Sequence, residues 1–202
     1  MTGPRHQPLA HLALAAAREA PRPDAGVTLR ALPYQPSIIL RGESGDAAFV
    51  KAFRAGLGFD LPLAPNHVSS HDEITALWLG PSEWLILGDV GPVAPAGQGR
   101  LARALAGRHH AIISQGDGRQ IIAVSGPRAR DVLGKLCPLD LESPDLAPGH
   151  CARSILARCG ILLHPQPGGA YHLHVARSFA DYAWRVLAEA GLEFGVAIAS
   201  GD

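Results

Sequence analysis

The sequence predicts an α+β fold built from two halves with antiparallel sheets, and three observations support this prediction. Short apolar segments are separated by Gly- and Pro-rich turns, which is typical of strands joined by hairpins. Other segments repeat apolar residues at helical spacing. A strand–turn–helix unit also occurs twice, at residues 38–62 and 121–141, about 80 residues apart, which is too long for a solenoid repeat. Each half therefore resembles a ferredoxin-like split βαβ layer.

Proline positions predict how the chain is divided. The Pro-rich segment at residues 20–25 ends any helix that precedes it, so we expect residues 1–26 to form an N-terminal arm or a short helix. Residues 27–115 are then the first half and residues 116–202 the second. We expect the two halves to pack as one compact unit.

The first half is expected to begin with a strand at residues 37–40, followed by a helix. Asp46 is a natural N-cap for this helix, because its carboxylate can accept a hydrogen bond from a free backbone N–H of the first turn. Gly56 or Gly58 supplies the stop. Residues 59–72 contain two prolines and are predicted to be a loop.

A β-hairpin is predicted next. The apolar segments at residues 76–79 and 84–87 flank a Gly-Pro-Ser-Glu turn. After a Gly- and Pro-rich stretch, the spacing of Leu101 and Leu105 predicts a short helix.

The second half is expected to open with another hairpin, formed by residues 111–114 and 120–124. Glycines at residues 116 and 118 supply the positive φ angles that a tight turn requires. A core-facing helix follows, with Pro127 suited to its first position and apolar side chains at i, i+3, i+4 and i+7 from Ala129.

The remaining elements of the second half are two strand-like segments and a helix. Residues 152–163 and 171–175 have strand character. The last helix is expected to begin at Ser178, which forms a variant of the capping box with Asp181, and to bury Phe179.

Composition and charge exclude several classes of partner. Lys plus Arg and Asp plus Glu both number 18, so the formal charge is zero and no positive field attracts nucleic acid or an anionic bilayer. No segment approaches the roughly 20 apolar residues that span a membrane. Three cysteines without close pairing indicate a reducing compartment, and we expect a cytoplasmic chain. A chain without net repulsion tends to associate, which favours a subunit of a complex.

Most patterns that point to catalysis have a simpler structural interpretation. His67 and His71 have the i, i+4 spacing of a helical metal site, but they lie in the predicted loop. His150 precedes Cys151, yet adjacent residues on a strand face opposite sides, so a buried structural thiol is favoured over a nucleophile.

Two further patterns lead to the same conclusion. His172 and His174 share one face of a predicted strand, which we interpret as its more hydrated side. Residues 125–128 open a helix as anion sites do, but Pro127 removes a donor amide there. We therefore predict no catalytic, cofactor-binding or metal-binding residue in this chain.

The two tryptophans that bracket the first hairpin turn are candidates for a partner interface. Strand alternation would leave either Trp78 or Trp84 pointing outward, and an exposed tryptophan on a sheet is a common anchor of protein interfaces. The alternative is that both belong to the core.

Five motifs resemble the gamma subunit of heterotetrameric sarcosine oxidase, in order and at natural spacing. They are LWLGPSEWL at 77–85, VSGPRARDVL at 124–133, CPLDL at 137–141, PGHCA at 148–152 and RSFADY at 177–182. The similarity covers roughly residues 27–192. This family is in turn similar to the glycine cleavage T protein, whose folate-binding domain is built from the same α+β units.

The resemblance implies an accessory, non-catalytic subunit of an oxidoreductase that acts on CH–NH donors. The assembled flavoenzyme would oxidatively demethylate sarcosine to glycine, with formaldehyde or methylenetetrahydrofolate and hydrogen peroxide as the other products. The implied partners are the alpha, beta and delta subunits. FAD, FMN, NAD and tetrahydrofolate are implied in the partner subunits, zinc in the small subunit, and no cofactor in this chain.

An alternative is a free-standing folate-dependent aminomethyltransferase-like protein, which the same fold resemblance suggests. The chain lacks room for the additional barrel domain of T proteins, and this disfavours the alternative.

Overall fold

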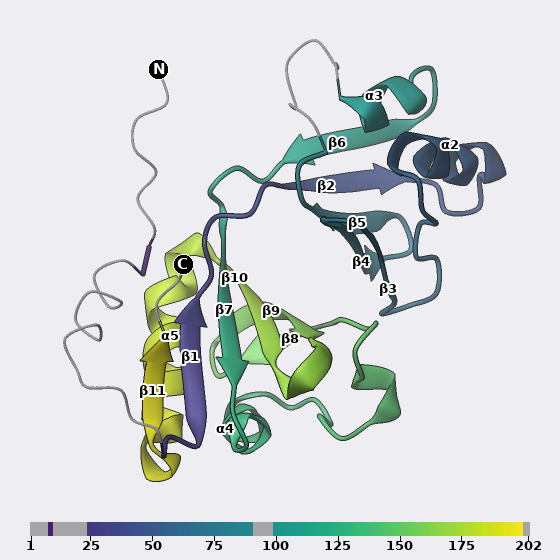
Figure 1. Cartoon of the computed structure of the whole chain (residues 1–202). Coiled ribbons are helices and arrows are strands. Elements are labelled where there is room, and N and C mark those ends of the chain that lie inside the picture. Colours follow the sequence, from purple (N-terminus) through teal and green to yellow (C-terminus); the bar gives the residue numbers. More distant parts are fainter. Residues whose placement is uncertain (1–7, 10–23, 91–98, 200–202) are drawn as a thin grey trace, which may run out of the picture. The chain divides into compact units, whose positions relative to one another are not determined.

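The computed structural model describes residues 8–9, 24–90 and 99–199 (Figure 1). Most of the arm predicted at residues 1–26 lies outside these ranges. The chain groups into two compact units, each described separately below. The six-stranded unit comprises residues 1–34, 117–148 and 152–202, and the five-stranded unit comprises residues 35–116 and 149–151.

The sheet of the six-stranded unit has, over the described residues, the strand order β11–β1–β7–β10–β9–β8. Its strands are β1 (Val27–Ala31), β7 (Arg119–Ser125), β8 (Ala152–Leu156), β9 (Cys159–Pro165), β10 (Tyr171–Ala176) and β11 (Val196–Ala199). Neighbours are antiparallel except for β1 and β11, which are parallel. A turn at Ala157, with φ 52°, divides the strand-like segment predicted at 152–163 into β8 and β9.

The sheet of the five-stranded unit has, within the same described ranges, the order β3–β4–β5–β2–β6, and all its neighbours are antiparallel. Its strands are β2 (Ser37–Gly42), β3 (Val68–His71), β4 (Ile74–Gly80), β5 (Glu83–Leu87) and β6 (His110–Ser114). The predicted α+β class and the β4–β5 hairpin are confirmed. The loop predicted at residues 59–72 is wrong in its last part, because residues 68–71 pair with β4.

Four α-helices of five to twelve residues accompany the sheets over the described part of the chain. They are α2 (Ala47–Leu57), α3 (Arg100–Ala104), α4 (Ala129–Leu136) and α5 (Ala180–Gly191). The predicted caps of α2 are confirmed: the Asp46 carboxylate accepts a hydrogen bond from the backbone N–H of Ala48 over 2.8 Å, and Gly58 ends the helix with φ 87°. These signals are local, so the sequence is sufficient to reveal them.

The second predicted hairpin is wrong. Strand β6 pairs with β2, whereas β7 pairs with β1 and β10, so the backbone passes from one unit to the other between these strands. Ile113 lies opposite Ile39, and Val124 lies opposite Leu29. Gly116 has φ 48°, as a turn requires, but distant apolar partners decide which strands pair.

The predicted halves also differ from the observed units at the first strand. Residues 27–115 were expected to form one half, but β1 pairs with β7 and β11 of the six-stranded unit. Neither β1 nor β11 is among the predicted strands. Their pairing with each other and with β7 supplies backbone hydrogen bonds that no local pattern reveals.

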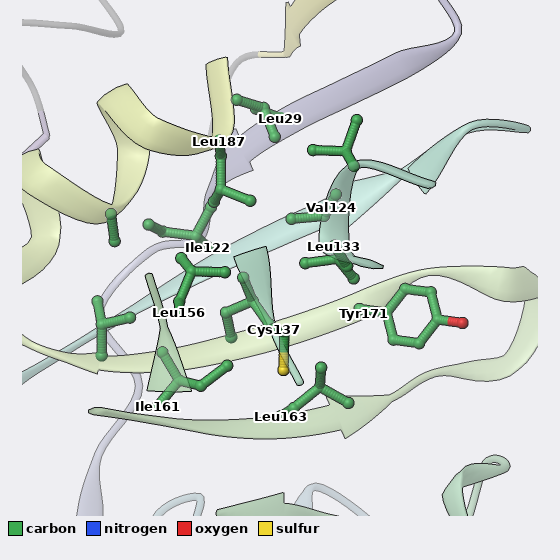
Figure 2. Packing of buried hydrophobic residues seen from close by; sticks show 14 of the residues in the cluster. Leu29, Ile122, Val124, Leu133, Cys137, Leu156, Ile161, Leu163, Tyr171 and Leu187 are labelled. Atoms are coloured by element: carbon green, nitrogen blue, oxygen red, sulfur yellow. The ribbon is translucent and has the colours of Figure 1, made fainter. Parts of the chain in front are cut away.

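Helices α4 and α5 contribute the core of the six-stranded unit together with the sheet. Figure 2 shows Leu29, Ile122 and Leu187 pointing toward one another in this core. Trp184 is also buried. Phe179, by contrast, is 46% exposed, because residues Arg177–Phe179 form a 3₁₀ turn before α5 begins. The predicted burial of Phe179 is therefore wrong.

The start of α5 differs from the predicted capping box. Ser178 lies inside the 3₁₀ turn, and the N-cap position makes no side-chain hydrogen bond. Asp181 instead accepts a hydrogen bond from Arg185, at 2.6 Å, one helical turn later. Pro127 similarly precedes the first residue of α4 by two positions.

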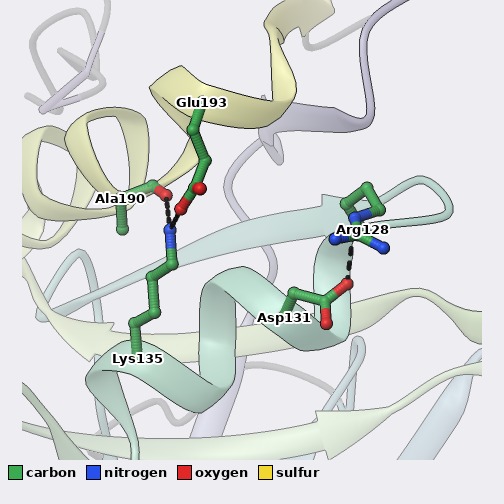
Figure 3. A network of polar contacts seen from close by, with 5 residues as sticks. All are labelled: Arg128, Asp131, Lys135, Ala190 and Glu193. Carbon is green, nitrogen blue, oxygen red and sulfur yellow. Dashed lines mark hydrogen bonds and ion pairs between the residues drawn. The ribbon is translucent and has the colours of Figure 1, made fainter.

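A polar network ties α4 to the segment that follows α5 (Figure 3). The Lys135 ammonium donates to the backbone carbonyl of Ala190 over 2.8 Å and forms an ion pair with Glu193. It also lies 4.5 Å from the ring centroid of Phe194. Near the start of α4, Arg128 pairs with Asp131 at 3.2 Å.

Candidate functional site

The two tryptophans predicted as partner contacts lie opposite each other on β4 and β5. Trp84 is fully buried, and its indole Nε1 donates a hydrogen bond to the backbone carbonyl of Pro62 over 2.8 Å. Trp78 is half-buried and packs against the same core. Directly opposite residues of two strands share one face of the sheet, so the turn does not direct one indole outward. A partner contact stays a prediction, and Trp78 is the indole with accessible surface for it.

The candidate metal ligands do not converge. His67 forms an isolated bridge with His150, with ring centroids 4.7 Å apart, whereas His71 ends β3 and contacts the Asp72 carboxylate at 3.6 Å. On a strand, an i, i+4 spacing corresponds to about 13 Å, too far to share an ion. Among the described residues, no group of three or more His, Cys, Asp or Glu side chains is arranged to hold a metal ion.

The thiols of Cys137, Cys151 and Cys159 are free and buried. Burial raises the pKa of Cys151 to about 12 and raises the pKa of Cys159. The Cys151 thiol also lies 3.4 Å from the backbone carbonyl of Trp78, which accepts a hydrogen bond from it. Because the thiolate is the nucleophile, the protonated side chains of Cys151 and Cys159 are poor nucleophiles. The predicted burial of Cys151 is confirmed.

A histidine cluster, consisting of the half-buried His164 and His172 and the buried His174 on β9 and β10, is absent from the sequence predictions. The ring centroid of His164 lies 6.2 Å from that of His172 and 6.2 Å from that of His174. His174 is 1% exposed, so its assignment to a hydrated strand face is wrong. Strand β10 lies between β7 and β9, and its face that carries His174 is covered rather than solvated.

Burial keeps this histidine cluster uncharged at neutral pH. It lowers the pKa of His164 to about 4, it lowers the pKa of His172, and it takes the pKa of His174 well below the usual value of 6.5. Neither ring nitrogen of His174 has a hydrogen-bond partner among the described residues. No carboxylate of the described residues contributes to these shifts, so within that part of the chain the cluster is not paired with an acidic group as catalytic histidines often are.

Comparison with known proteins gives a consistent result along the chain. The model of the family described as "Sarcosine oxidase, gamma subunit family" matches residues 41–193. The sarcosine oxidase subunit gamma of Arthrobacter sp. is 31% identical over 197 residues, covering 96% of this chain and 93% of the relative.

Solved structures with a similar fold include two that are informative. A chain of the heterotetrameric sarcosine oxidase from Corynebacterium sp. U-96, in complex with pyrrole 2-carboxylate, aligns with a TM-score of 0.82 and 28% identity over 96% of this chain and 97% of that chain. The glycine cleavage system aminomethyltransferase T from Bartonella henselae aligns with a TM-score of 0.65 and 15% identity, over 95% of this chain and 58% of that chain. The second similarity concerns the fold alone.

None of the helices within the described ranges combines the length and the hydrophobicity needed to cross a lipid bilayer.

Proposed function

The chain belongs to the sarcosine oxidase gamma subunit family, and from this premise we propose that it is a non-catalytic accessory subunit of a heterotetrameric sarcosine oxidase. The complex would oxidatively demethylate sarcosine to glycine and form formaldehyde or methylenetetrahydrofolate together with hydrogen peroxide. The observation that carries the proposal is similarity over nearly the full length of both chains, 96% of this one and 93% of the gamma subunit from Arthrobacter sp..

The chemistry of the buried ionisable groups supports an accessory role. The Cys151 thiol stays protonated and the His164 and His174 imidazoles stay neutral at pH 7, because burial disfavours their charged forms. The Cys151 thiol donates a hydrogen bond to the backbone carbonyl of Trp78 and has a raised pKa, so it does not form the thiolate that a nucleophile requires.

In this proposal the reaction takes place in the partner chains. We assign FAD, FMN, NAD and tetrahydrofolate to the larger subunits among alpha, beta and delta, and zinc to the small one. The present chain contributes folded surface, including the half-buried Trp78, and the complex is cytoplasmic.

Co-expression tests the accessory role directly. The chain should co-purify with the neighbouring oxidase subunits of its own genome and give sarcosine-dependent oxygen consumption only in their presence. The purified chain alone should retain no flavin absorbance and no turnover. Sarcosine oxidation or a tightly bound flavin in the isolated chain would contradict the proposal.

The aminomethyltransferase-like alternative has its own test. Its support is the fold similarity to aminomethyltransferase T, at 15% identity. Calorimetric titration of the isolated chain with tetrahydrofolate should give no saturable heat if the chain is purely accessory. Micromolar binding would favour the alternative.

A further inference from the structure

A polar cavity of about 390 Å³ opens in the five-stranded unit. It lies between the last turn of α2, the β3–β4 turn and α3. Arg100 and Arg103 line it from α3, and His71 and Asp72 line it from the turn. All of these elements belong to one unit, so the cavity is a property of that unit.

A close contact between α2 and α3 positions the two arginines. A Cβ atom on Gly56 would lie 3.1 Å from the Cβ of Ala104 and 3.2 Å from the Cα of Leu101, so the absence of a side chain lets the helices approach. Leu101 and Leu105 are buried in the core and hold α3 in place. Residues three apart share a helix face, which places Arg100 and Arg103 on the same side of α3.

The charge of this cavity is predominantly positive. Arg100 and Arg103 are exposed and make no ion pair with any described residue, whereas Arg54 in the same unit pairs with Asp60 at 3.0 Å. The carboxylate that lines the cavity, Asp72, contacts His71 at 3.6 Å. Two guanidinium groups are therefore available to an external anion.

The surrounding sequence reinforces this charge. Residues 90–116 contain Arg100, Arg103, Arg108 and two histidines but no Asp or Glu, in a chain whose net charge is zero. Such a local excess attracts acidic partners even though the whole molecule has no net field.

We propose that this basic cavity receives the carboxylates of an acidic segment of a partner subunit. Arginine binds carboxylates through two parallel hydrogen bonds, and it is enriched at the energetically important positions of interfaces. A volume of about 390 Å³ far exceeds the roughly 10–15 Å³ that one water needs on the same measure, so there is room for peptide side chains. The polar lining differs from the mostly apolar lining of typical small-molecule sites. The inference rests on the proposed function, which supplies the partner.

The test compares full-length chains in the assembled complex. The double variant Arg100→Gln, Arg103→Gln removes both charges, and Arg158→Gln, at an exposed arginine in the β8–β9 turn of the other unit, is the matched control. Subunit affinity is measured by biolayer interferometry from 50 to 500 mM NaCl. The double variant should bind roughly 10- to 100-fold more weakly at low salt and lose most of the salt dependence, whereas Arg158→Gln should match the wild type.

The outcomes separate this inference from the proposed function. A wild-type chain that binds no oxidase subunit contradicts the proposed function. A wild-type complex whose affinity and salt dependence are unchanged in the double variant overturns the cavity assignment alone. Binding of inorganic phosphate or malonate to the isolated chain that is lost in the double variant, without any change in subunit affinity, assigns the cavity to a small anion and also overturns it. Thermal melting followed by circular dichroism verifies that each variant is folded. The single variant Arg103→Gln removes one of the two charges and serves if the double variant does not fold.

Discussion

The indole Nε1 of Trp84 donates a hydrogen bond over 2.8 Å to the backbone carbonyl of Pro62, 22 residues earlier in the chain. This bond joins β5 to the segment between α2 and β3, inside the core of the five-stranded unit. A backbone carbonyl buried without a partner costs about 1–3 kcal/mol. Trp84 therefore contributes a buried hydrogen bond in addition to apolar packing.

Replacing Trp84 should destabilise the protein far more than replacing Trp78. Trp84→Phe leaves the Pro62 carbonyl unpaired and should lower the free energy of unfolding by about 1–3 kcal/mol in urea denaturation. Trp78→Phe, at a half-buried position on the same sheet face, should lower it by less than about 1 kcal/mol. If Trp78 contacts a partner, its substitution should instead weaken subunit binding. Equal destabilisation by both variants would contradict the assigned roles.

Two glycines should respond to alanine with opposite signs. Gly126 has φ 105°, and an added Cβ would lie 2.5 Å from the backbone oxygen of Gly26, so Gly126→Ala should destabilise the chain by more than about 1 kcal/mol. Gly134 lies within α4 with no atom within 4 Å of an added Cβ. Gly134→Ala should stabilise the chain by roughly 0.5–1 kcal/mol, because alanine loses less backbone entropy in a helix. Urea denaturation of both variants measures whether each substitution raises or lowers the free energy of unfolding.

The charge of Lys135 should contribute more to stability than that of an ordinary surface residue. Lys135→Met keeps the apolar stem but removes the hydrogen bond to Ala190, the pairing with Glu193 and the contact with the Phe194 ring (Figure 3). We expect a loss of about 1–2 kcal/mol in the free energy of unfolding. Arg185→Met, which breaks an exposed i, i+4 pair with Asp181, should cost about 0.3–0.5 kcal/mol. If Lys135→Met and Arg185→Met lower the free energy of unfolding equally, the contacts of Lys135 contribute no more than an exposed ion pair.

Stability should fall in mild acid because of the histidine cluster. Arg119 and Arg30 are the charged neighbours that further oppose protonation of His174 and His172. Since the folded pKa of His164 is about 4 and its usual value is 6.5, the unfolded chain binds more protons between these values. The contribution is therefore complete above pH 6.5 and is lost as the pH falls toward 4, by at most about 3 kcal/mol for this residue.

Urea denaturation between pH 4 and pH 8 measures this dependence. His164→Phe should flatten the curve, because it removes one group that the unfolded chain protonates. His109→Gln, at an exposed position, should leave the slope unchanged. A flat wild-type curve over this range would contradict the burial of the histidines.

The cysteines should be protected from thiol reagents in the native protein. Cys151 and Cys159 are buried and their pKa values are raised, to about 12 for Cys151. We expect native chain at pH 8 to react with Ellman's reagent at least roughly 100-fold more slowly than chain unfolded in guanidinium, because reaction requires a thiolate and an opening of the structure. Rapid labelling of even one native thiol would place that cysteine at the surface.

The sequence was sufficient to predict elements whose signals are local. The caps of α2 at Asp46 and Gly58 act within one helical turn, and the β4–β5 hairpin has a short connecting turn. Strands β1 and β11 carry no comparable signal, because their pairing partners lie far away in the sequence. The link between β6 and β7 was predicted to be a hairpin turn. Gly116 has the predicted positive φ and Gly118 does not, and the strands that pair are decided by distant residues.

The candidate sites depend even more on distant residues. The basic cavity combines Gly56, Asp72 and Arg100 from three separate segments, which no motif in the sequence brings together. The burial of His174 depends on what covers that face of β10, and this is a property of the folded chain rather than of the local sequence. The sequence shows that residues 90–116 contain no Asp or Glu, but only the structure shows that two arginines of this stretch line a cavity.

The parallel pairing of β1 with β11 places Val27 opposite Val196 and has a consequence for biosynthesis. Until the ribosome has made residue 199, β1 lacks its outer neighbour and remains an open edge to which other polypeptides can add. The long separation between these strands also makes closure of the sheet a late and slow event in folding.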